Sequence, residues 1–299
     1  MDDSAKGNAA ESKDDRSWSI FDVPPPLKRI FDHFPLQTYP VDELPQRVPR
    51  GRTDHVLHVF TTENDAAHNR PSFNPQCLKY QTYLRFAGIR FRTVVSSNHA
   101  SPTGVLPFVQ PGSSNPDCLS PSQPIPSNKL RKWVEVAGSS EQLKEEDDVR
   151  YDAYTSLLEG RIRTLWLCQL YLVAPNAPLV RRLYVNPCSS QPFVRTAIAQ
   201  QLQAAAETEV IKARQKNAVS LLDVSRDAEE AFLAFSSLLG DDSWFFGNDR
   251  PGMFDASVFA YTHLLLDENL GWVHNPAGEI VKRHENLARH RDRILDMYF

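Results

Sequence analysis

The stretch that decides the fold is residues 55–109, and its central part reads NPQCLKYQTYLRFAGIRFRTVV over residues 74–95. Hydrophobic periodicity predicts a strand over residues 55–60, a helix over 75–87 and a second strand over 90–95. A polar loop is expected between the first strand and the helix, from Glu63 to Phe73.

Both ends of this helix carry the residues that helix ends favour. Asn74 can accept a hydrogen bond from the first free amides, and Pro75 suits the first helical position. Gly88 can adopt the left-handed conformation that follows a last helical turn. One apolar face is predicted from residues that recur at helical spacing: Cys77, Tyr80, Leu84 and Ala87.

A helix between two strands in so short a span favours a βαβ unit on a mainly parallel sheet. Residues 89–95 alternate and are β-branched, as in a half-buried strand. A further strand opens on Leu106 and Pro107, because proline is tolerated at the first residue of a strand. The sequence leaves open whether the Pro107 peptide bond is cis.

Composition limits the class of protein. The chain has 299 residues, 41% of them hydrophobic and 23% charged, which suffices for two modest domains. Its 33 basic and 37 acidic side chains give a net charge of −4, so we expect no nucleic-acid partner.

The four cysteines form no Cys-x-x-Cys pair, and helix-face cysteines are usually reduced core residues, so a reducing compartment is expected. They are Cys77, Cys118, Cys168 and Cys188.

Targeting signals of the common kinds are not evident. The first residues are acidic and resemble neither a secretory signal nor an Arg-rich presequence. No apolar run approaches the roughly 20 residues that span a bilayer. The best, residues 165–173, is short and contains Gln169. We therefore expect a soluble or peripheral protein.

Residues 1–54 are expected to form an N-terminal arm, polar and disordered up to residue 17. Between residues 18 and 40, prolines alternate with large apolar side chains, which prevents a long helix and disfavours exposure to water. This part either packs on its own domain or docks on a partner as an extended strap. The candidate docking residues are Trp18, Phe21, Leu27, Ile30, Phe31 and Phe34.

Two domains are expected after the arm. Residues 55–138 should form an α/β domain closed by a helix over 129–137, with a Pro-, Ser- and Gly-rich loop inserted at 111–126. A charged linker over 139–148 should separate it from an all-helical domain at 149–299.

The second domain shows helical periodicity throughout. A long helix starts near Val149 and should end at Pro175 and Pro178. The other helices are expected at residues 193–222, 228–239, 255–267 and 285–298. The helix at 255–267 is apolar all round and is therefore expected to be the core.

The N-terminal pattern, with the turn Thr103-Gly104-x-Leu106-Pro107-Phe108, resembles the thioredoxin-like half of the glutathione transferase fold. The helix from Asn74 to Ile89 resembles, more specifically, the metaxin family. The resemblance implies a glutathione-transferase-like fold, with a thioredoxin-like domain followed by a C-terminal helical bundle.

The C-terminal half carries the resemblance separately. Trp244-Phe245-Phe246-Gly247, followed by Pro251 and Asp255, is similar to the loop and buried helix start of glutathione transferases. Gly252 replaces the usual Ser or Thr cap, and Asp255 suits the first helical turn, so both are expected to serve folding. The final residues, from Asn286 to Phe299, resemble a metaxin terminus.

Catalysis is not expected. A transferase of this fold needs a hydroxyl or thiol at the first helix's N-terminus, where the helix dipole stabilises a thiolate. Here Asn74 takes that slot, and Cys77 takes a core-facing one. Ser72 is the nearby hydroxyl. The fold normally holds the γ-glutamyl group of glutathione with an acidic residue or Gln followed by Ser or Thr. Here Ser127 could serve as the second residue, but Pro126 stands at the first and has no hydrogen-bonding side chain.

No metal or cofactor is predicted either. His55 and His58 fall on opposite faces of a strand, and His284 and His290 do not align on a helix. The phosphate-binding, dinucleotide, zincin and esterase motifs are absent from the sequence. The basic residues near the C-terminus mark either an exposed helix face or a contact with anionic lipid. They are Lys282, Arg283, Arg289, Arg291 and Arg293.

The resemblance to metaxins implies a peripheral, non-catalytic subunit on the cytosolic face of the mitochondrial outer membrane. Its implied partners are an Omp85-type β-barrel channel, a second metaxin-like subunit and β-barrel precursors, bound through an extended signal strand. The candidate precursor-binding cleft between the domains comprises Asn74, Cys77, Pro107 and Ser127.

Two alternatives stay open at this point. One is an active glutathione-dependent enzyme that uses Ser72 or Ser127. The other is a cytosolic scaffold without a membrane role.

Overall fold

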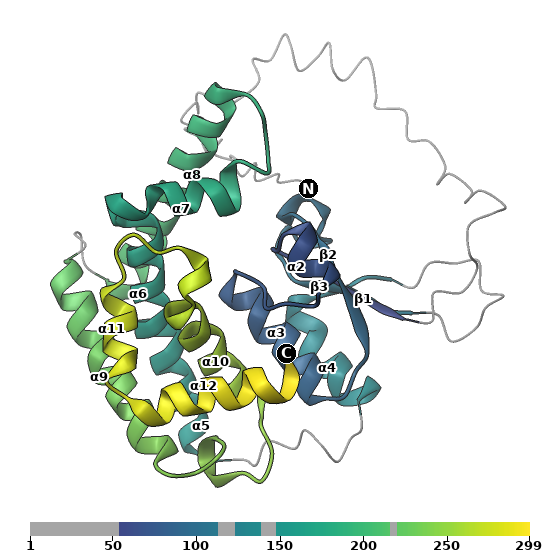
Figure 1. Ribbon diagram of the computed structural model, residues 1–299, viewed down its shortest axis with the longest axis vertical. Coiled ribbons are helices and arrows are strands. Elements are labelled where there is room, and N and C mark those ends of the chain that lie inside the picture. The colour runs from purple at the N-terminus through teal and green to yellow at the C-terminus, as the bar shows by residue number, and fades with distance from the viewer. Residues whose placement is uncertain (1–53, 113–122, 139–147, 216–219) are drawn as a thin grey trace, which may run out of the picture. The chain divides into compact units, whose positions relative to one another are not determined.

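The computed structural model describes residues 54–112, 123–138, 148–215 and 220–299 (Figure 1). The predicted docking arm at residues 18–40 and most of the expected linker at 139–148 lie outside these ranges.

One four-stranded sheet has the order β2-β1-β3-β4. Its strands are β1 (His55–Val59), β2 (Phe91–Val95), β3 (Phe108–Gln110) and β4 (Ile125–Pro126). Of these neighbours, β1 and β2, which a helical segment connects, run parallel, whereas β1–β3 and β3–β4 are antiparallel. The prediction of a mainly parallel sheet is therefore wrong. Parallel strands need a long crossover, and after β2 the chain returns with reversed direction instead.

The predicted helix is confirmed as α3 (Pro75–Phe86). Asn74 Oδ1 accepts a hydrogen bond from the Cys77 amide at 3.2 Å, and Gly88 has φ +68° after the last turn. The helix buries most of its surface, including Cys77, Tyr80 and Leu84. Figure 1 shows α3 between the sheet and the helices of the C-terminal half.

The expected loop between β1 and α3 contains a short helix, α2 (Glu63–Ala67). The Thr62 hydroxyl oxygen accepts a hydrogen bond from the Asp65 amide at 3.1 Å, which caps the helix. Polar composition concealed this cap, because every side chain in α2 stays exposed or half-buried.

The inserted loop is shorter than predicted. Residues 125 and 126 form β4, opposite Val109 and Phe108. The closing helix, α4 (Ser127–Ala137), begins two residues before the predicted start at Lys129. The peptide bond between Leu106 and Pro107 is cis.

The helical half begins with one continuous helical run. Its successive parts are α5 (Arg150–Leu157), the π-helical turn η2 (Leu158–Ile162), α6 (Arg163–Leu167) and a second π-helical turn, η3 (Cys168–Leu172). This run ends at Val173, whose backbone is extended.

The prolines that were expected to end this helix stand in the first turns of the next two elements, η4 (Ala174–Asn176) and α7 (Ala177–Val180), which η5 (Arg181–Val185) follows. Pro175 and Pro178 therefore start helices, as proline does where no amide donor is needed.

The next two helices are α8 (Pro192–Arg214) and α9 (Leu221–Leu239). The predicted boundaries, 193–222 and 228–239, are therefore wrong on both sides of the junction. The hydroxyl of Ser220 accepts a hydrogen bond from the Asp223 amide at 3.3 Å and starts α9 seven residues earlier than predicted.

The core of the helical half is α10 (Met253–Leu266), in which every residue from Met253 to Leu265 is buried, as predicted. It packs against α3 on one side and against α11 (Pro276–Lys282) and α12 (Glu285–Tyr298) on another (Figure 1). The predicted bounds of the last helix are confirmed. In the part of the chain that the structure describes, no helix combines the length and hydropathy that crossing a membrane requires.

Candidate functional site

Two of the four predicted cleft residues meet through the strand register. Phe108 of β3 pairs with His58 of β1 and with Pro126 of β4. Pro107 directly precedes Phe108, and Ser127 directly follows Pro126, so both residues adjoin this paired position at the carboxyl end of β1.

The start of α3 is tied to the same end of β1. The hydroxyl of Ser72 donates a hydrogen bond of 2.5 Å to the carbonyl oxygen of Phe60, which follows β1 directly. Asn74 and Cys77 share the cap hydrogen bond at the first turn of α3. The fold thus gathers Asn74, Cys77, Pro107 and Ser127 at one end of the sheet.

These four residues differ in what they offer to a ligand. Cys77 and Pro107 are buried, whereas Asn74 and Ser127 are half-buried. Only the last two have surface that another molecule can contact.

The amides of the first turn of α3 are largely used within the protein. Pro75 has no amide hydrogen, the Cys77 amide donates to Asn74 Oδ1, and the Leu78 amide donates to the Asn74 carbonyl at 2.8 Å. A thiolate at a helix N-terminus depends on free donors there. Only the amide of Gln76 is left among the first three residues.

The thiol of Cys77 is held in its protonated form. Burial raises its pKa to about 12, although hydrogen bonds with Phe60 and Ser72 act in the opposite direction. Because the thiolate is the nucleophile, this cysteine has no reactive form near neutral pH.

Ser72 is fully buried and makes structural hydrogen bonds. Besides donating to Phe60, its hydroxyl accepts from the Asn74 amide at 3.2 Å, and its own amide donates to Gln81 Oε1 at 2.9 Å. The hydroxyl therefore fastens β1 to α3 and points to no open surface.

An aromatic cluster with rings from both halves of the protein surrounds the start of α3. Asn74 Nδ2 donates a hydrogen bond to the Tyr184 hydroxyl at 3.2 Å. The Tyr184 ring lies 5.3 Å from the ring of Phe60, 5.4 Å from that of Phe73 and 6.1 Å from that of Tyr171, between centroids. Tyr184 is 7% exposed. The cap residue of α3 is thus bonded to a buried side chain of the helical half.

The sequence carries no signal for Tyr184, which stands 110 positions after Asn74 in a segment without a motif. Desolvation raises the pKa of Tyr171 to about 12 and that of Tyr184 well above its ordinary value, so both phenols stay neutral.

Gly252 and Asp255 lie where the cap was predicted, at the start of α10. Asp255 Oδ2 accepts from the Gly252 amide at 2.9 Å, and Oδ1 accepts from the Phe245 amide at 3.1 Å. A third partner, His290 Nε2 of α12, lies 2.9 Å from Oδ1. Asp255 thereby connects a loop and two helices.

A cavity of about 260 Å³ lies at the other end of α3. Its lining combines aromatic and apolar side chains with two charged ones, and the lining residues are Phe86, Trp244, Asp249, Arg250, Pro251, Met297 and Tyr298. It shares no residue with the predicted cleft.

The basic residues near the C-terminus are largely paired with acids. Lys282 Nζ lies 2.9 Å from a Glu279 oxygen, and Arg283 Nη1 lies 2.5 Å from a Glu229 oxygen. Arg291 pairs with Asp292. Across the described ranges, no group of three or more His, Cys, Asp or Glu side chains is placed to hold a metal ion.

Comparison with known families gives three matches. The model of the glutathione S-transferase N-terminal domain matches residues 75–176, and that of the C-terminal domain matches residues 228–294. The family described as SAM35, subunit of SAM complex, matches residues 21–80. Neither transferase match covers residues 177–227, the segment that contains Tyr184 and α8.

Curated proteins similar to this chain are metaxins. Metaxin-3 of Xenopus laevis is 30% identical over 234 residues, which are 77% of this chain and 73% of that protein. Human metaxin-1 is 27% identical over 237 residues, again 77% of this chain but 48% of that longer protein.

Solved structures with a similar fold are glutathione S-transferases. Two from Ceriporiopsis subvermispora, both in complex with glutathione, have TM-scores of 0.52 at 11% and 12% identity. They cover 82% and 81% of this chain, and 98% and 97% of their own lengths. The fold is therefore glutathione-transferase-like, with a thioredoxin-like N-terminal part and a helical C-terminal part.

Proposed function

Because this chain belongs to the metaxin family, we propose that it is a non-catalytic subunit of the mitochondrial outer-membrane sorting and assembly machinery. The match of residues 21–80 to a family described as a subunit of the SAM complex supports a role related to that complex. In this role the chain acts at the cytosolic face, with an Omp85-type channel and a second metaxin-like subunit.

The single observation that carries the non-catalytic part is the hydrogen bond between Asn74 and Tyr184. Asn74, which stands where a transferase would need a hydroxyl or thiol, is instead bonded to the helical half. Together with the protonated, buried Cys77 and the bonded Ser72, it leaves the α3 start without a nucleophile. The alternative of an active glutathione-dependent enzyme therefore has no support from this site.

The task of this subunit is to receive β-barrel precursors through their extended signal strand. Extended peptides are recognised by strand addition or by apolar pockets. Asn74 and Ser127 are the cleft residues with surface to contact such a strand, while Cys77 and Pro107 support the backbone beneath them. The arm at residues 18–40, which lies outside the described residues, is proposed to hold the channel subunit.

Native electrophoresis of gently solubilised mitochondria tests the proposal, with the tagged full chain and a conjugation assay on the same eluate. We expect co-migration with an Omp85-type barrel and no glutathione conjugation. A chain that migrates alone and turns over glutathione would overturn both parts.

Two variants separate the sites within this function. Deletion of residues 18–40 should abolish co-migration with the channel. Asn74→Ala combined with Ser127→Ala should leave the complex assembled but weaken crosslinking to a β-barrel precursor arrested in transit. Unchanged crosslinking would place the precursor elsewhere on the chain.

A further inference from the structure

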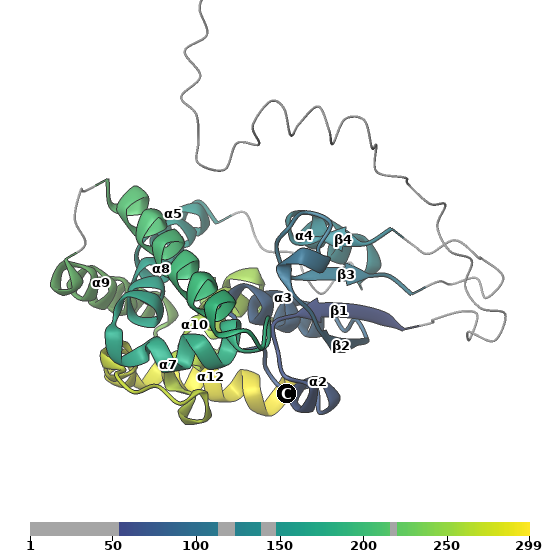
Figure 2. The same cartoon turned by 90° about the horizontal axis from the view of Figure 1, so that it is seen from above.

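The first half of α8 has an unusual surface for an exposed helix. Residues 183–206 contain a single charged side chain, Arg195, and no acid. Exposed helix faces usually carry charged residues of both signs opposite the buried stripe. Figure 2 shows α8 in front of the other helices of this half, on its outside.

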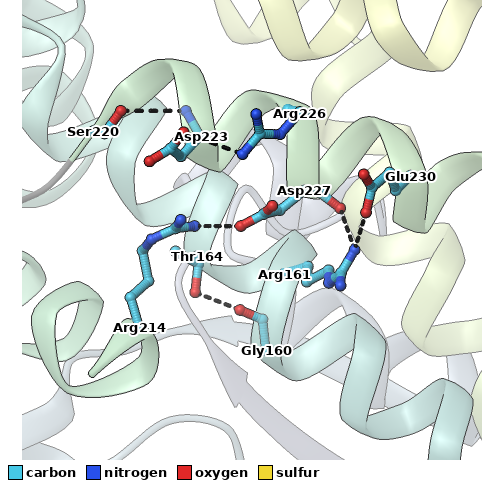
Figure 3. Close-up of polar contacts among 9 residues, drawn as sticks. All are labelled: Gly160, Arg161, Thr164, Arg214, Ser220, Asp223, Arg226, Asp227 and Glu230. Atoms are coloured by element: carbon cyan, nitrogen blue, oxygen red, sulfur yellow. Dashed lines mark hydrogen bonds and ion pairs between the residues drawn. The ribbon is translucent and has the colours of Figure 1, made fainter. Parts of the chain in front are cut away.

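The second half of α8 anchors the helix. Ala206 and Val210 are its only buried residues among those described. Arg214 Nη1 forms an ion pair of 2.7 Å with Asp227 Oδ2 of α9, and Arg161 reaches the same turn of α9 (Figure 3). The first half of α8 contributes no fully buried residue, and its contacts with the core come from half-buried side chains such as Ile198 and Leu202.

The turn before α8 and the first residues of the helix, together residues 186–194, are termed the α8 tip. Phe193 is 91% exposed and Val194 is 45% exposed. The tip has a defined turn, because the Cys188 amide donates to the Val185 carbonyl at 3.1 Å and the Gln191 amide donates to the Ser189 hydroxyl at 3.1 Å. Leaving a phenylalanine in water forgoes a large apolar burial.

Basic residues flank this uncharged tip. Arg181 is exposed and Arg195 half-buried, and neither forms an ion pair with any residue in the described ranges. Arg195 Nε donates to the Ser189 carbonyl, which orients its guanidinium along the tip. Phe193 thus lies between two arginines that have no ion-pair partner in the described ranges. This arrangement is complementary to a bilayer surface, where lipid phosphates lie above the apolar acyl chains.

We propose that the α8 tip is a membrane contact, in which Phe193 inserts into the acyl boundary of a bilayer while Arg181 and Arg195 bind lipid phosphates. The proposal rests on the proposed function in one respect, since it assumes work at the outer membrane. It adds the means of attachment for a chain without a spanning helix in its described part.

Flotation of the purified full chain with vesicles tests this contact without any other subunit. The vesicles are phosphatidylcholine alone and phosphatidylcholine mixed with phosphatidylinositol. We expect Phe193→Asp to lower the partition coefficient by about tenfold or more, as loss of a buried aromatic side chain implies. Leu222→Asp is the matched control, because Leu222 is 85% exposed at the start of α9 and lies outside the tip. Arg181→Glu should abolish any preference for phosphatidylinositol.

Wild-type binding that survives Phe193→Asp, or that falls equally with Leu222→Asp, would overturn the proposal. So would a lipid-free dimer, seen by sedimentation velocity, that Phe193→Asp disperses while vesicle binding is absent; the tip would then bind a second copy. Failure of the proposed function is seen separately, as a wild-type chain missing from the native complex in mitochondria.

Discussion

Asn74 and Tyr184 join the thioredoxin-like part to the helical part through one hydrogen bond of 3.2 Å, from the amide nitrogen of Asn74 to the phenol oxygen. Asn74 is also the cap of α3, where its Oδ1 accepts a hydrogen bond from the Cys77 amide. The same residue thus supports the packing of the two parts.

Tyr184→Phe should lower the free energy of unfolding by about 1 kcal/mol, because it removes this hydrogen bond and leaves Asn74 Nδ2 without that acceptor. Tyr184→Ala should cost about 3–5 kcal/mol, because it opens a cavity among Phe60, Phe73 and Tyr171. Urea unfolding followed by tryptophan fluorescence measures both. Val136→Ala, at an 86% exposed position, serves as control. Equal stability of Tyr184→Phe and the wild type would show that the hydrogen bond contributes nothing.

Asp255→Ala should destabilise the helical half by about 3 kcal/mol or more, because three groups lose a charged, buried acceptor. Its unfolding midpoint in urea should fall accordingly. The control is Asp292→Ala, whose carboxylate is 58% exposed and pairs with Arg291, so that its change should stay within about 0.5 kcal/mol. Similar midpoints for the two variants would contradict a folding role for Asp255.

His263 should make the protein less stable in acid. Burial lowers its pKa from 6.5 to about 4, with the Arg291 charge acting in the same direction. The unfolded chain therefore binds one more proton between these pH values, so stability is complete above pH 6.5 and declines as the pH falls towards 4. The full effect is about 3 kcal/mol.

Urea titrations at a series of pH values measure this slope. His263→Gln should flatten it over the same interval, while His68→Gln, on the exposed end of α2, should leave it unchanged. An equal slope in His263→Gln would mean that another group carries the acid sensitivity.

The cysteines should differ sharply towards a thiol reagent such as an aromatic disulfide. Burial raises the pKa of Cys77 to about 12 and that of Cys168 to about 11, whereas Cys188 is exposed. In a Cys118→Ser background, one thiol should react promptly in the folded protein and two more only in denaturant. Adding Cys188→Ser should remove the fast reaction. Fast labelling that persists in this double variant would show that a buried cysteine is accessible.

Much of the local structure could be predicted from short patterns. The cap at Asn74, the turn at Gly88 and the bounds of the last helix depend on residues within one or two helical turns. The pattern failed where polar residues concealed a cap, as at Thr62 and Ser220, so that α2 was missed and α9 was predicted to start too late.

The sequence predicted which residues belong to the candidate site but not which side chains surround them. Asn74, Cys77, Pro107 and Ser127 stand at the same end of the sheet, next to the last residues of β1. Their surroundings depend on Tyr184 and Tyr171. Both tyrosines stand in apolar segments, and an apolar segment does not reveal which part of the core it will contact. Likewise, nothing in the sequence near Asp255 indicates that His290 completes its hydrogen bonds.

The sequence by itself determined the caps at Asn74 and at Asp255 and the buried helix α10, because each depends on a residue type or on neighbours a few positions away. Only the tertiary structure decided the direction of β3, the closure of the α3 start by Tyr184 and the exposure of Phe193. These three depend on which distant segments pack together, and that choice minimises exposed apolar surface over the whole chain rather than within any one segment.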